Sequence, residues 1–366
     1  MALQELHIHQ FRNIESQRLA FSPSLNLIHG LNGSGKTSLL EAIYYLSSGR
    51  SFRTSKHNRV VREGSDRLTL FGRVREESGE HRLGIERVIG RQEATLHHNG
   101  LRVPTIAEFA RLMPVSVIEP GTFDLVAGAP GYRRRFLDWL VFHVEHDYGR
   151  RWKACQRAIR QRNHLLRHGT ISDQELGPWT EQVAAHGEDI TRSRETGFEL
   201  FRRELEQMMS NSEAGWARGL SVEFARGWDK SRSLGETLSG NPESERRAGF
   251  TLYGPNRADI RIRYGNLPAG EVLSRGQQRS LVILMKLAQM RVLRDRSGIR
   301  GVCLLDDINA ELDAGNQQLL ASELLALGCQ LFVTSITSPG HEGPWSKVSA
   351  GDHRMFHVEH GQFSEQ

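Results

Sequence analysis

Eight residues near the N-terminus have the types and spacing that bind phosphate. The segment from Gly30 to Thr37 reads GLNGSGKT and fits the pattern G-x-x-x-x-G-K-[ST]. It lies between a short apolar run and an amphipathic stretch, where glycines let backbone N–H groups surround phosphate oxygens at a helix N-terminus. Lys36 is expected to reach the β- and γ-phosphates of ATP, and the Thr37 hydroxyl to ligate Mg²⁺. The residues predicted to contact ATP are Gly30, Leu31, Asn32, Gly33, Ser34, Gly35, Lys36, Thr37 and Ser38.

Two carboxylates far along the chain complete the chemistry of an ATPase. Asp306 and Asp307 follow the apolar run Val302–Leu305, which is typical of a buried parallel strand. We expect Asp306 to hold Mg²⁺ through water, and Asp307 to orient or deprotonate the attacking water. Surface turns after strands also often carry Asp, so the pair alone is not specific. It indicates an ATPase site only in combination with Lys36 and Thr37. Lys36 and Asp307 are the predicted catalytic residues.

A third segment narrows the class of ATPase. Ser274, Arg275, Gly276 and Gln277 open a long apolar-periodic stretch upstream of Asp306 and resemble the signature motif of ABC-type ATPases. In that superfamily the motif binds the γ-phosphate of a nucleotide held by a second protomer. Ser274 is a short donor, Gly276 permits close approach, and a helix N-terminus attracts an anion. The alternative is an ordinary serine helix cap. Asp313 lies in the D-loop position, where capping of the next helix would also explain it.

The elements that must position these residues are split in sequence. The apolar periodicity indicates an α/β fold: an ABC-type ATPase head with a phosphate-loop core and an antiparallel β-subdomain, interrupted by a helical lobe. We assign residues 1–110 and 251–366 to the ATPase lobe and residues 111–250 to the inserted lobe. Lys36–Ser47 is predicted to be the helix after the phosphate loop. Asn99-Gly100 predicts a hairpin turn, because both residues tolerate positive φ.

The composition adds a weak indication of a nucleic-acid partner. The chain has 366 residues and a formal net charge of +5, mostly from arginine, whose planar fork suits phosphate. Acidic residues nearly balance the basic ones. A basic run after the first helix is our candidate for DNA contact, although a solvated loop would look the same. Its members are Arg50, Arg53, Lys56 and Arg59.

Targeting signals and paired cysteines are not apparent in the sequence. The three cysteines are widely spaced, the first residues lack a signal-peptide core, and no apolar stretch reaches the length of a membrane span. The protein is therefore predicted to be cytoplasmic and reduced, without a membrane partner.

Several further segments make the whole chain similar to one family. They resemble the RecF family, and together they are far more specific than the phosphate loop alone. The segments are Phe11–Asn13, Leu40–Tyr44, Gly49–Arg53, Arg133–Asp138, Ser274–Arg279 and Leu305–Asp307. Asn256 and Ala258 replace the His and Asp of the family's Gly-Pro-His-Arg-Asp segment.

The resemblance implies a two-lobed, SMC-like ATPase without a long coiled coil. It implies an ATP-dependent homodimer on double-stranded DNA near junctions with single-stranded DNA, and slow, DNA-stimulated ATP hydrolysis with Mg²⁺. It also implies work with RecR and RecO in loading RecA at gaps, and roles in replication-fork maintenance and the SOS response. Three other readings stay open: a transporter's ATP-binding subunit, a DNA clamp of the SMC type, and a non-hydrolysing ATP-gated DNA-binding module. The segment Val333–Ser335 occupies the place where transporter ATPases carry a switch histidine.

Overall fold

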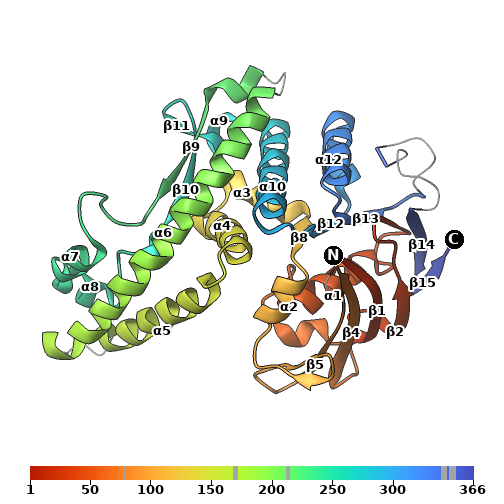
Figure 1. Ribbon diagram of the computed structural model, residues 1–366, viewed down its shortest axis with the longest axis horizontal. Coiled ribbons are helices and arrows are strands. Elements are labelled where there is room, and N and C mark those ends of the chain that lie inside the picture. Colours follow the sequence, from red (N-terminus) through yellow and green to blue (C-terminus); the bar gives the residue numbers. More distant parts are fainter. Residues whose placement is uncertain (78, 168–171, 212–214, 339–343, 346–351) are drawn as a thin grey trace. The chain divides into compact units, whose positions relative to one another are not determined.

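The chain packs as two compact units. The computed structural model describes residues 1–77, 79–167, 172–211, 215–338, 344–345 and 352–366 (Figure 1). The first unit comprises Met1–Thr122 with Gly298–Gln366, and the second comprises Phe123–Ser297. The first unit is therefore split in sequence. The boundary differs from the sequence-based assignment, because residues 251–297 pack within the second unit and residues 111–122 within the first.

A mainly parallel sheet forms the centre of the first unit, in the order β15-β14-β3-β13-β12-β8. All pairings are parallel except that of β14 with β15. Every residue of β3, β8, β12 and β13 is buried, as expected for strands covered on both faces. The bounds are β3 Leu25–His29, β8 Val115–Ile118, β12 Val302–Leu305, β13 Gln330–Ser335, β14 His353–Glu359 and β15 Gln362–Glu365.

An antiparallel sheet forms the second layer of this unit, in the order β2-β1-β4-β5-β6-β7. The predicted hairpin turn is confirmed: Asn99 and Gly100 join β6 to β7 with φ of 52° and 83°. The bounds are β1 Ala2–Phe11, β2 Ile14–Ala20, β4 Arg67–Glu76, β5 Gly79–Val88, β6 Thr95–His98 and β7 Leu101–Arg102.

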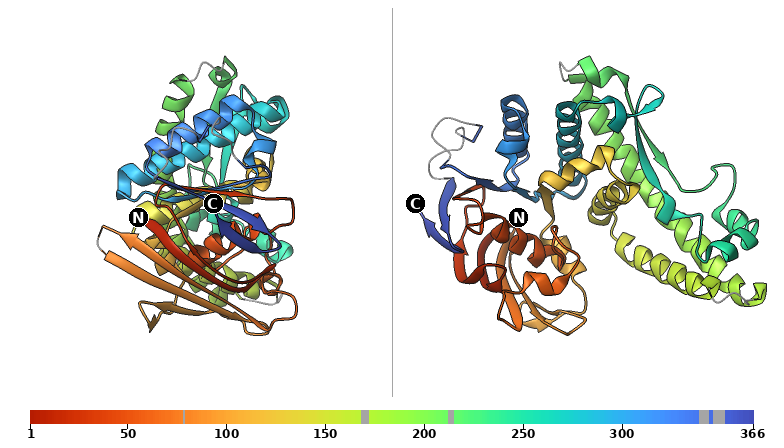
Figure 2. Two further views of the ribbon diagram at one scale, coloured as in Figure 1. Left: turned by 90° about the vertical axis from the view of Figure 1, so that its right-hand side faces the viewer. Right: turned by 180° about the vertical axis from the view of Figure 1, so that it is seen from behind.

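Helix α1, Lys36–Ser48, lies between the two sheets and contacts strands of both. The sequence predicted one apolar stripe. The helix is instead buried on almost all sides, because a sheet covers each face. Helix α12, Ala314–Ala326, lies on the other face of the parallel sheet in Figures 1 and 2. The remaining helices of the unit are η1 His57–Val60, α2 Ala107–Leu112, η2 Pro120–Phe123, which ends across the boundary, and α11 Ile308–Glu311.

The second unit is mainly helical and carries a three-stranded antiparallel sheet in the order β11-β10-β9. Its longest helix, α6, spans Asp173–Asn211 and contacts α4, α5, α7 and α10. None of the helices in the described part of the chain has both the length and the apolarity needed to cross a membrane. The other elements are α3 Asp124–Ala127, α4 Pro130–Val144, α5 Tyr148–Arg167, η3 Gly215–Gly219, β9 Leu220–Ala225, α7 Leu234–Ser239, α8 Pro242–Ala248, η4 Pro255–Arg257, β10 Asp259–Tyr264, β11 Leu267–Pro268, α9 Ala269–Val272 and α10 Arg275–Ser297.

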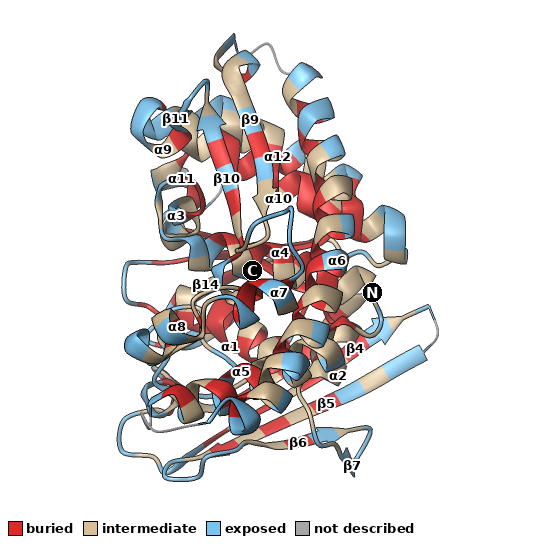
Figure 3. Ribbon diagram, turned by 90° about the vertical axis from the view of Figure 1, so that its left-hand side faces the viewer, coloured by how far each residue is buried: buried red, intermediate tan, exposed pale blue. Residues whose placement is uncertain are grey.

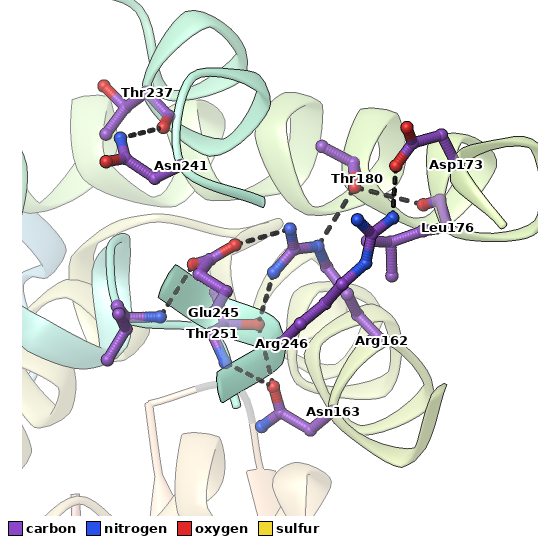
Figure 4. Close-up of polar contacts among 11 residues, drawn as sticks. Arg162, Asn163, Asp173, Leu176, Thr180, Thr237, Asn241, Glu245, Arg246 and Thr251 are labelled. Carbon is purple, nitrogen blue, oxygen red and sulfur yellow. Dashed lines mark hydrogen bonds and ion pairs between the residues drawn. The ribbon is translucent and has the colours of Figure 1, made fainter. Parts of the chain in front are cut away.

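Buried ion pairs hold the helices of the second unit together. Arg162 of α5 is 1% exposed and donates to Glu245 at 2.6 Å, and to the hydroxyls of Thr180 and Thr251 at 3.0 Å each (Figure 4). Glu245 in turn accepts from the Leu252 N–H at 2.8 Å. Because every charge in this cluster is paired, removal of one partner would leave the other buried and uncompensated.

The segment Arg133–Asp138 proves to be structural. Arg133 binds Asp259 through two hydrogen bonds of 2.8 and 3.0 Å, and Arg134 donates to the Ala258 carbonyl at 2.8 Å. Asp138 holds Arg194, which donates to the Pro255 carbonyl at 2.6 Å. These contacts anchor the segment Gly254–Asp259. The two departures from the family pattern fit here: Ala258 is fully buried, and the Asn256 amide oxygen accepts from Gln156 at 2.8 Å.

Candidate functional site

An open cavity of about 720 Å³ in the first unit collects most of the predicted ATP-site residues. The carboxyl ends of β3, β12 and β13 meet at one edge of the parallel sheet, because these strands run in the same direction. The phosphate loop follows β3, and Asp306-Asp307 follow β12. From the predicted set, the cavity is lined by Asn32, Gly33, Gly35, Lys36, Thr37, Ser38 and Asp307.

The phosphate loop is folded around the Lys36 ammonium group. Its Nζ donates to the Gly30 carbonyl at 2.7 Å and to the Leu31 carbonyl at 3.1 Å, and the residue is 3% exposed. Gly30 (φ 156°) and Gly35 (φ 124°) have backbone conformations that side-chain-bearing residues rarely adopt. Leu31, by contrast, is 75% exposed. The loop thus places a cation at the N-terminus of α1, where the helix dipole also favours an anion.

Thr37 and Asp306 are brought into direct contact, as a shared metal site requires. The Thr37 hydroxyl donates to Asp306 Oδ1 at 3.0 Å, and Thr334 donates to the same oxygen at 2.9 Å. Burial raises the pKa of Asp306, although hydrogen bonds from Thr334 and Thr37 oppose the shift. These oxygen donors are of the kind that Mg²⁺ prefers, and a bound cation would compensate the buried carboxylate. The residues therefore fit Mg²⁺.

Asp307 presents a carboxylate oxygen that the described residues leave without a hydrogen-bond partner. Its Oδ1 is buried, and the residue lines the cavity. The backbone of Asp307 has φ 47° and ψ 36°, a left-handed conformation that is uncommon for a residue other than glycine. Its N–H donates to the Thr334 hydroxyl at 2.9 Å. Strained and unsatisfied groups of this kind cluster at functional sites, so the geometry suits a group that acts on a bound molecule.

The C-terminal hairpin of β14 and β15 fixes one peptide group of the phosphate loop. The Gly361 N–H donates to the Ser34 carbonyl at 2.7 Å, and the Asn13 amide donates to the same carbonyl at 3.2 Å. In a planar trans peptide the carbonyl and the next N–H point in opposite directions. Holding the Ser34 carbonyl on one side therefore turns the Gly35 N–H to the other side, where it can bind an anion.

A buried glutamate holds two arginines beside the cavity. Glu41 of α1 is fully buried and accepts hydrogen bonds from Arg12 at 2.8 and 2.6 Å and a further one from Ser51. Arg53 lies 3.8 Å from the same carboxylate. Arg53 and Arg59 both line the cavity, whereas Arg50 and Lys56 are exposed outside its lining. The basic run proposed for DNA contact is thus divided between the cavity and the open surface.

The signature residues begin α10 in the second unit. Ser274, Arg275 and Gly276 are exposed, and Gln277 is half-buried. The Ser274 hydroxyl accepts from the Gln277 N–H at 3.3 Å, while the Gln277 side chain accepts from the Ser274 N–H at 2.9 Å, so the serine does cap the helix. Asp313 likewise caps α12 by accepting from the Asn316 N–H at 2.8 Å. Capping leaves both motifs at the surface.

Sequence reasoning missed Thr334, Asn13 and Gly361 as members of the site. Thr334 is fully buried at the end of β13, where it bridges Asp306 and the backbone of Asp307. Its place at the carboxyl end of the strand beside β12 was a usable signal. For Gly361 the sequence offered no such signal, because this residue meets the phosphate loop only in the folded chain.

Comparison with known proteins decides the family. Residues 2–349 match the family model described as RecF/RecN/SMC N terminal domain. The chain is 48% identical to the DNA replication and repair protein RecF of Marinobacter nauticus, with all of both chains covered. It is 40% identical to the RecF of Cellvibrio japonicus, covering 100% of this chain and 99% of the relative.

The chain belongs to the RecF family. A solved structure titled as the recombination mediator protein RecF-ATPrS in the RecFOR pathway agrees with the fold, with a TM-score of 0.86, 25% identity, and coverage of 99% of this chain and 97% of that one. An Smc head bound to the C-winged helix domain of ScpA has a TM-score of 0.56 at 15% identity, with 100% of this chain and 97% of that one covered, and shows likeness of fold alone. The expected ABC-type ATPase architecture is confirmed for this RecF-family chain.

Proposed function

We propose that this protein is a cytoplasmic, ATP-dependent DNA-binding protein of recombinational gap repair. The observation that carries the proposal is the contact between Thr37 and Asp306 beside an unpartnered oxygen of Asp307, next to a complete phosphate loop. The relatives named DNA replication and repair protein RecF, and the mediator RecF solved with ATPrS, support the biological setting.

ATP would lie against the phosphate loop of the first unit. Backbone N–H groups from Gly33 to Ser38 would bind its phosphates, and Lys36 would exchange its loop carbonyls for the β- and γ-phosphates. Thr37 and Asp306 would hold Mg²⁺, which neutralises charge on the phosphates when it is bound. Asp307 would accept a proton from the attacking water. Asp307 is half-buried, with one buried carboxylate oxygen and a left-handed backbone that fixes its geometry, which suits a slow and regulated hydrolysis.

The reaction would need a second copy of the chain. Ser274, Arg275, Gly276 and Gln277 would close over the nucleotide of the partner protomer, with Asp313 near the same interface. Gly276 supports this role, because a Cβ at this position would meet no described atom within 4 Å. Glycine in a helix costs roughly 0.5–1 kcal/mol relative to alanine. None of the described residues gives a packing reason for a glycine here. Close approach by a partner would supply one.

The biological assignments come from the family resemblance. ATP-driven dimers would form on double-stranded DNA near junctions with single-stranded DNA, with Arg50, Arg53, Lys56 and Arg59 as candidate contacts. Work with RecR and RecO in loading RecA, replication-fork maintenance and the SOS response belong to the same proposal.

The variant Asp307→Asn tests the chemistry. We expect its DNA-stimulated ATPase rate to fall by a factor on the order of 10²–10⁴, the usual contribution of a general base. ATP-dependent dimerisation should persist, because the phosphate loop and signature are intact. Asp66→Asn, an exposed site in the same unit, is the matched control. A wild-type ATPase that duplex DNA does not stimulate, or an unchanged rate in Asp307→Asn, would contradict the proposal.

A further inference from the structure

The surface of α5 carries an uninterrupted basic stripe. Helix α5 contains seven arginine and lysine residues and no aspartate or glutamate, so its charge of +7 exceeds the +5 of the entire chain. By contrast, the neighbouring α6 is rich in acidic residues. The near-neutral composition of the protein therefore conceals a strong local separation of charge.

Five of the seven arginine and lysine residues, together with His164, occupy one side of the helix at spacings of three and four. We call this set the α5 stripe. All of its members are exposed. At ~100° per residue they fall within an arc about 100° wide. The α5 stripe consists of Arg150, Lys153, Arg157, Arg160, His164 and Arg167.

The opposite side of α5 is anchored in the core. Its buried residues include Cys155, Ile159 and Leu166, and α5 lies along α6 in Figure 1. Two arginines lie off the stripe: Arg162 is neutralised by Glu245 (Figure 4), and Arg151 lies 4.0 Å from Asp147. Figure 3 shows exposed and buried residues alternating along the helix. Packing of this buried side fixes the orientation of α5, so the α5 stripe faces away from the core.

Three members of the stripe form no ion pair with any residue that the structure describes. Arg157, Arg160 and Arg167 are exposed and make no such contact in the described ranges. Arg150, at the start of the helix, lies 3.2 Å from Asp147. Uncompensated arginines in a row repel one another and gain from a polyanion that lies along them.

We propose that the α5 stripe binds the phosphate backbone of duplex DNA. Its length from Arg150 to Arg167 is ~25 Å at ~1.5 Å per residue. Duplex DNA carries one charge per ~1.7 Å of axis, so the stripe matches about seven base pairs. Arginine suits phosphate through its planar fork, and contacts of this kind hold DNA without reading its sequence.

An acidic protein is the other polyanion that such a face could meet. Protein interfaces are enriched in aromatic and other large apolar side chains at their centre. None of the exposed large hydrophobic residues in the described chain lies on α5. The absence of an apolar anchor among these residues favours DNA.

The test is the salt dependence of duplex binding by the full-length protein with ATP and Mg²⁺. We would measure fluorescence anisotropy of a labelled duplex between 50 and 200 mM salt for Arg157→Gln with Arg160→Gln. Each lost phosphate contact removes ~0.9 from the slope of log K against log salt, so the slope should become shallower by ~1.8. Binding at 0.1 M salt should weaken by roughly 60-fold.

Two further double variants separate charge from folding. Arg157→Lys with Arg160→Lys keeps the charges and should restore most of the slope. Arg261→Gln with Arg263→Gln removes two exposed charges from β10 of the same unit and should leave the slope unchanged. ATP binding should be equal in all variants.

This inference rests on the proposed function, and the outcomes distinguish the two. Wild-type protein that binds no duplex with ATP overturns both. Wild-type binding with an unchanged slope in the Arg157→Gln, Arg160→Gln variant overturns the stripe alone. The same variant could also lose binding to poly-glutamate while its duplex slope stays unchanged. That result would show that the α5 stripe binds acidic proteins instead of DNA, and it would overturn the inference.

Discussion

Gly361 couples the C-terminal hairpin to the phosphate loop, and Gly361→Ala should therefore weaken ATP binding. The residue has φ 77°, and a Cβ added there would lie 2.4 Å from the Asn13 carbonyl oxygen. Backbone atoms cannot yield cheaply at such a distance, so the turn must move away from Asn13. That movement would lengthen the 2.7 Å hydrogen bond from Gly361 to the Ser34 carbonyl and release the peptide that orients the Gly35 N–H.

Two separate costs are expected from this substitution. Alanine in the left-handed region destabilises the fold by about 1–2 kcal/mol, whichever site is chosen. Loss of one hydrogen bond adds ~1 kcal/mol. If the lost hydrogen bond destabilises the loop conformation that binds ATP by this ~1 kcal/mol, the Kd for ATP rises about fivefold or more. Gly90→Ala separates the costs, because Gly90 has φ 83° and a Cβ there would meet no described atom within 4 Å.

The assay is titration calorimetry with ATP and Mg²⁺, accompanied by thermal unfolding without nucleotide. Both variants should lose stability, with the larger loss in Gly361→Ala because of its clash with the Asn13 carbonyl, and only Gly361→Ala should bind ATP more weakly. Equal ATP affinity in the two variants would refute the idea that the hairpin orients the phosphate loop.

Two other predictions concern buried charges. Asp306 has a raised pKa because of burial, so the folded state binds its proton more tightly than the unfolded chain; the free energy of unfolding then falls as pH rises from about 3.8 through the folded pKa. Asp306→Asn should therefore raise the apo protein's melting temperature at pH 7.5, by an increment that shrinks toward pH 4.5, and should abolish the added stability from Mg²⁺ with ATP. Asp313→Asn is its control with the opposite sign, since hydrogen bonds from the Asn316 and neighbouring N–H groups lower the pKa of Asp313; no melting-temperature gain in Asp306→Asn would contradict the reasoning. Arg162→Ala should lower the unfolding free energy by roughly 3–5 kcal/mol in urea denaturation, because Glu245 is left buried and unpaired. The double change Arg162→Met, Glu245→Leu should cost less than Arg162→Ala, and an equal or greater loss would show that packing rather than charge dominates.

The parts of the site that local sequence encodes could be predicted. The glycine spacing of the phosphate loop, the apolar run before Asp306 and the serine before α10 each act through neighbouring residues, and the structure places them as the pattern requires. The bounds of α1 and the start of α10 were therefore accessible from the sequence.

Contacts between distant segments could not be predicted in the same way. Gly361 and Ser34 are linked only by the fold, as are Glu41 and Arg12. The membership of α10 in the second unit depends on its packing against α4 and α6, which apolar periodicity alone does not specify. Total charge hid the α5 stripe, because composition averages over acidic and basic surfaces.

Sedimentation velocity with and without ATP and Mg²⁺, on wild type and Ser274→Arg, measures most directly whether two chains share one nucleotide. Ser274 is exposed, so a larger side chain there should leave the fold intact while blocking a partner. Wild type should change from monomer to dimer on adding ATP, and Ser274→Arg should bind ATP yet stay monomeric. A wild type that remains monomeric with ATP bound, or a variant that dimerises equally well, would contradict the account.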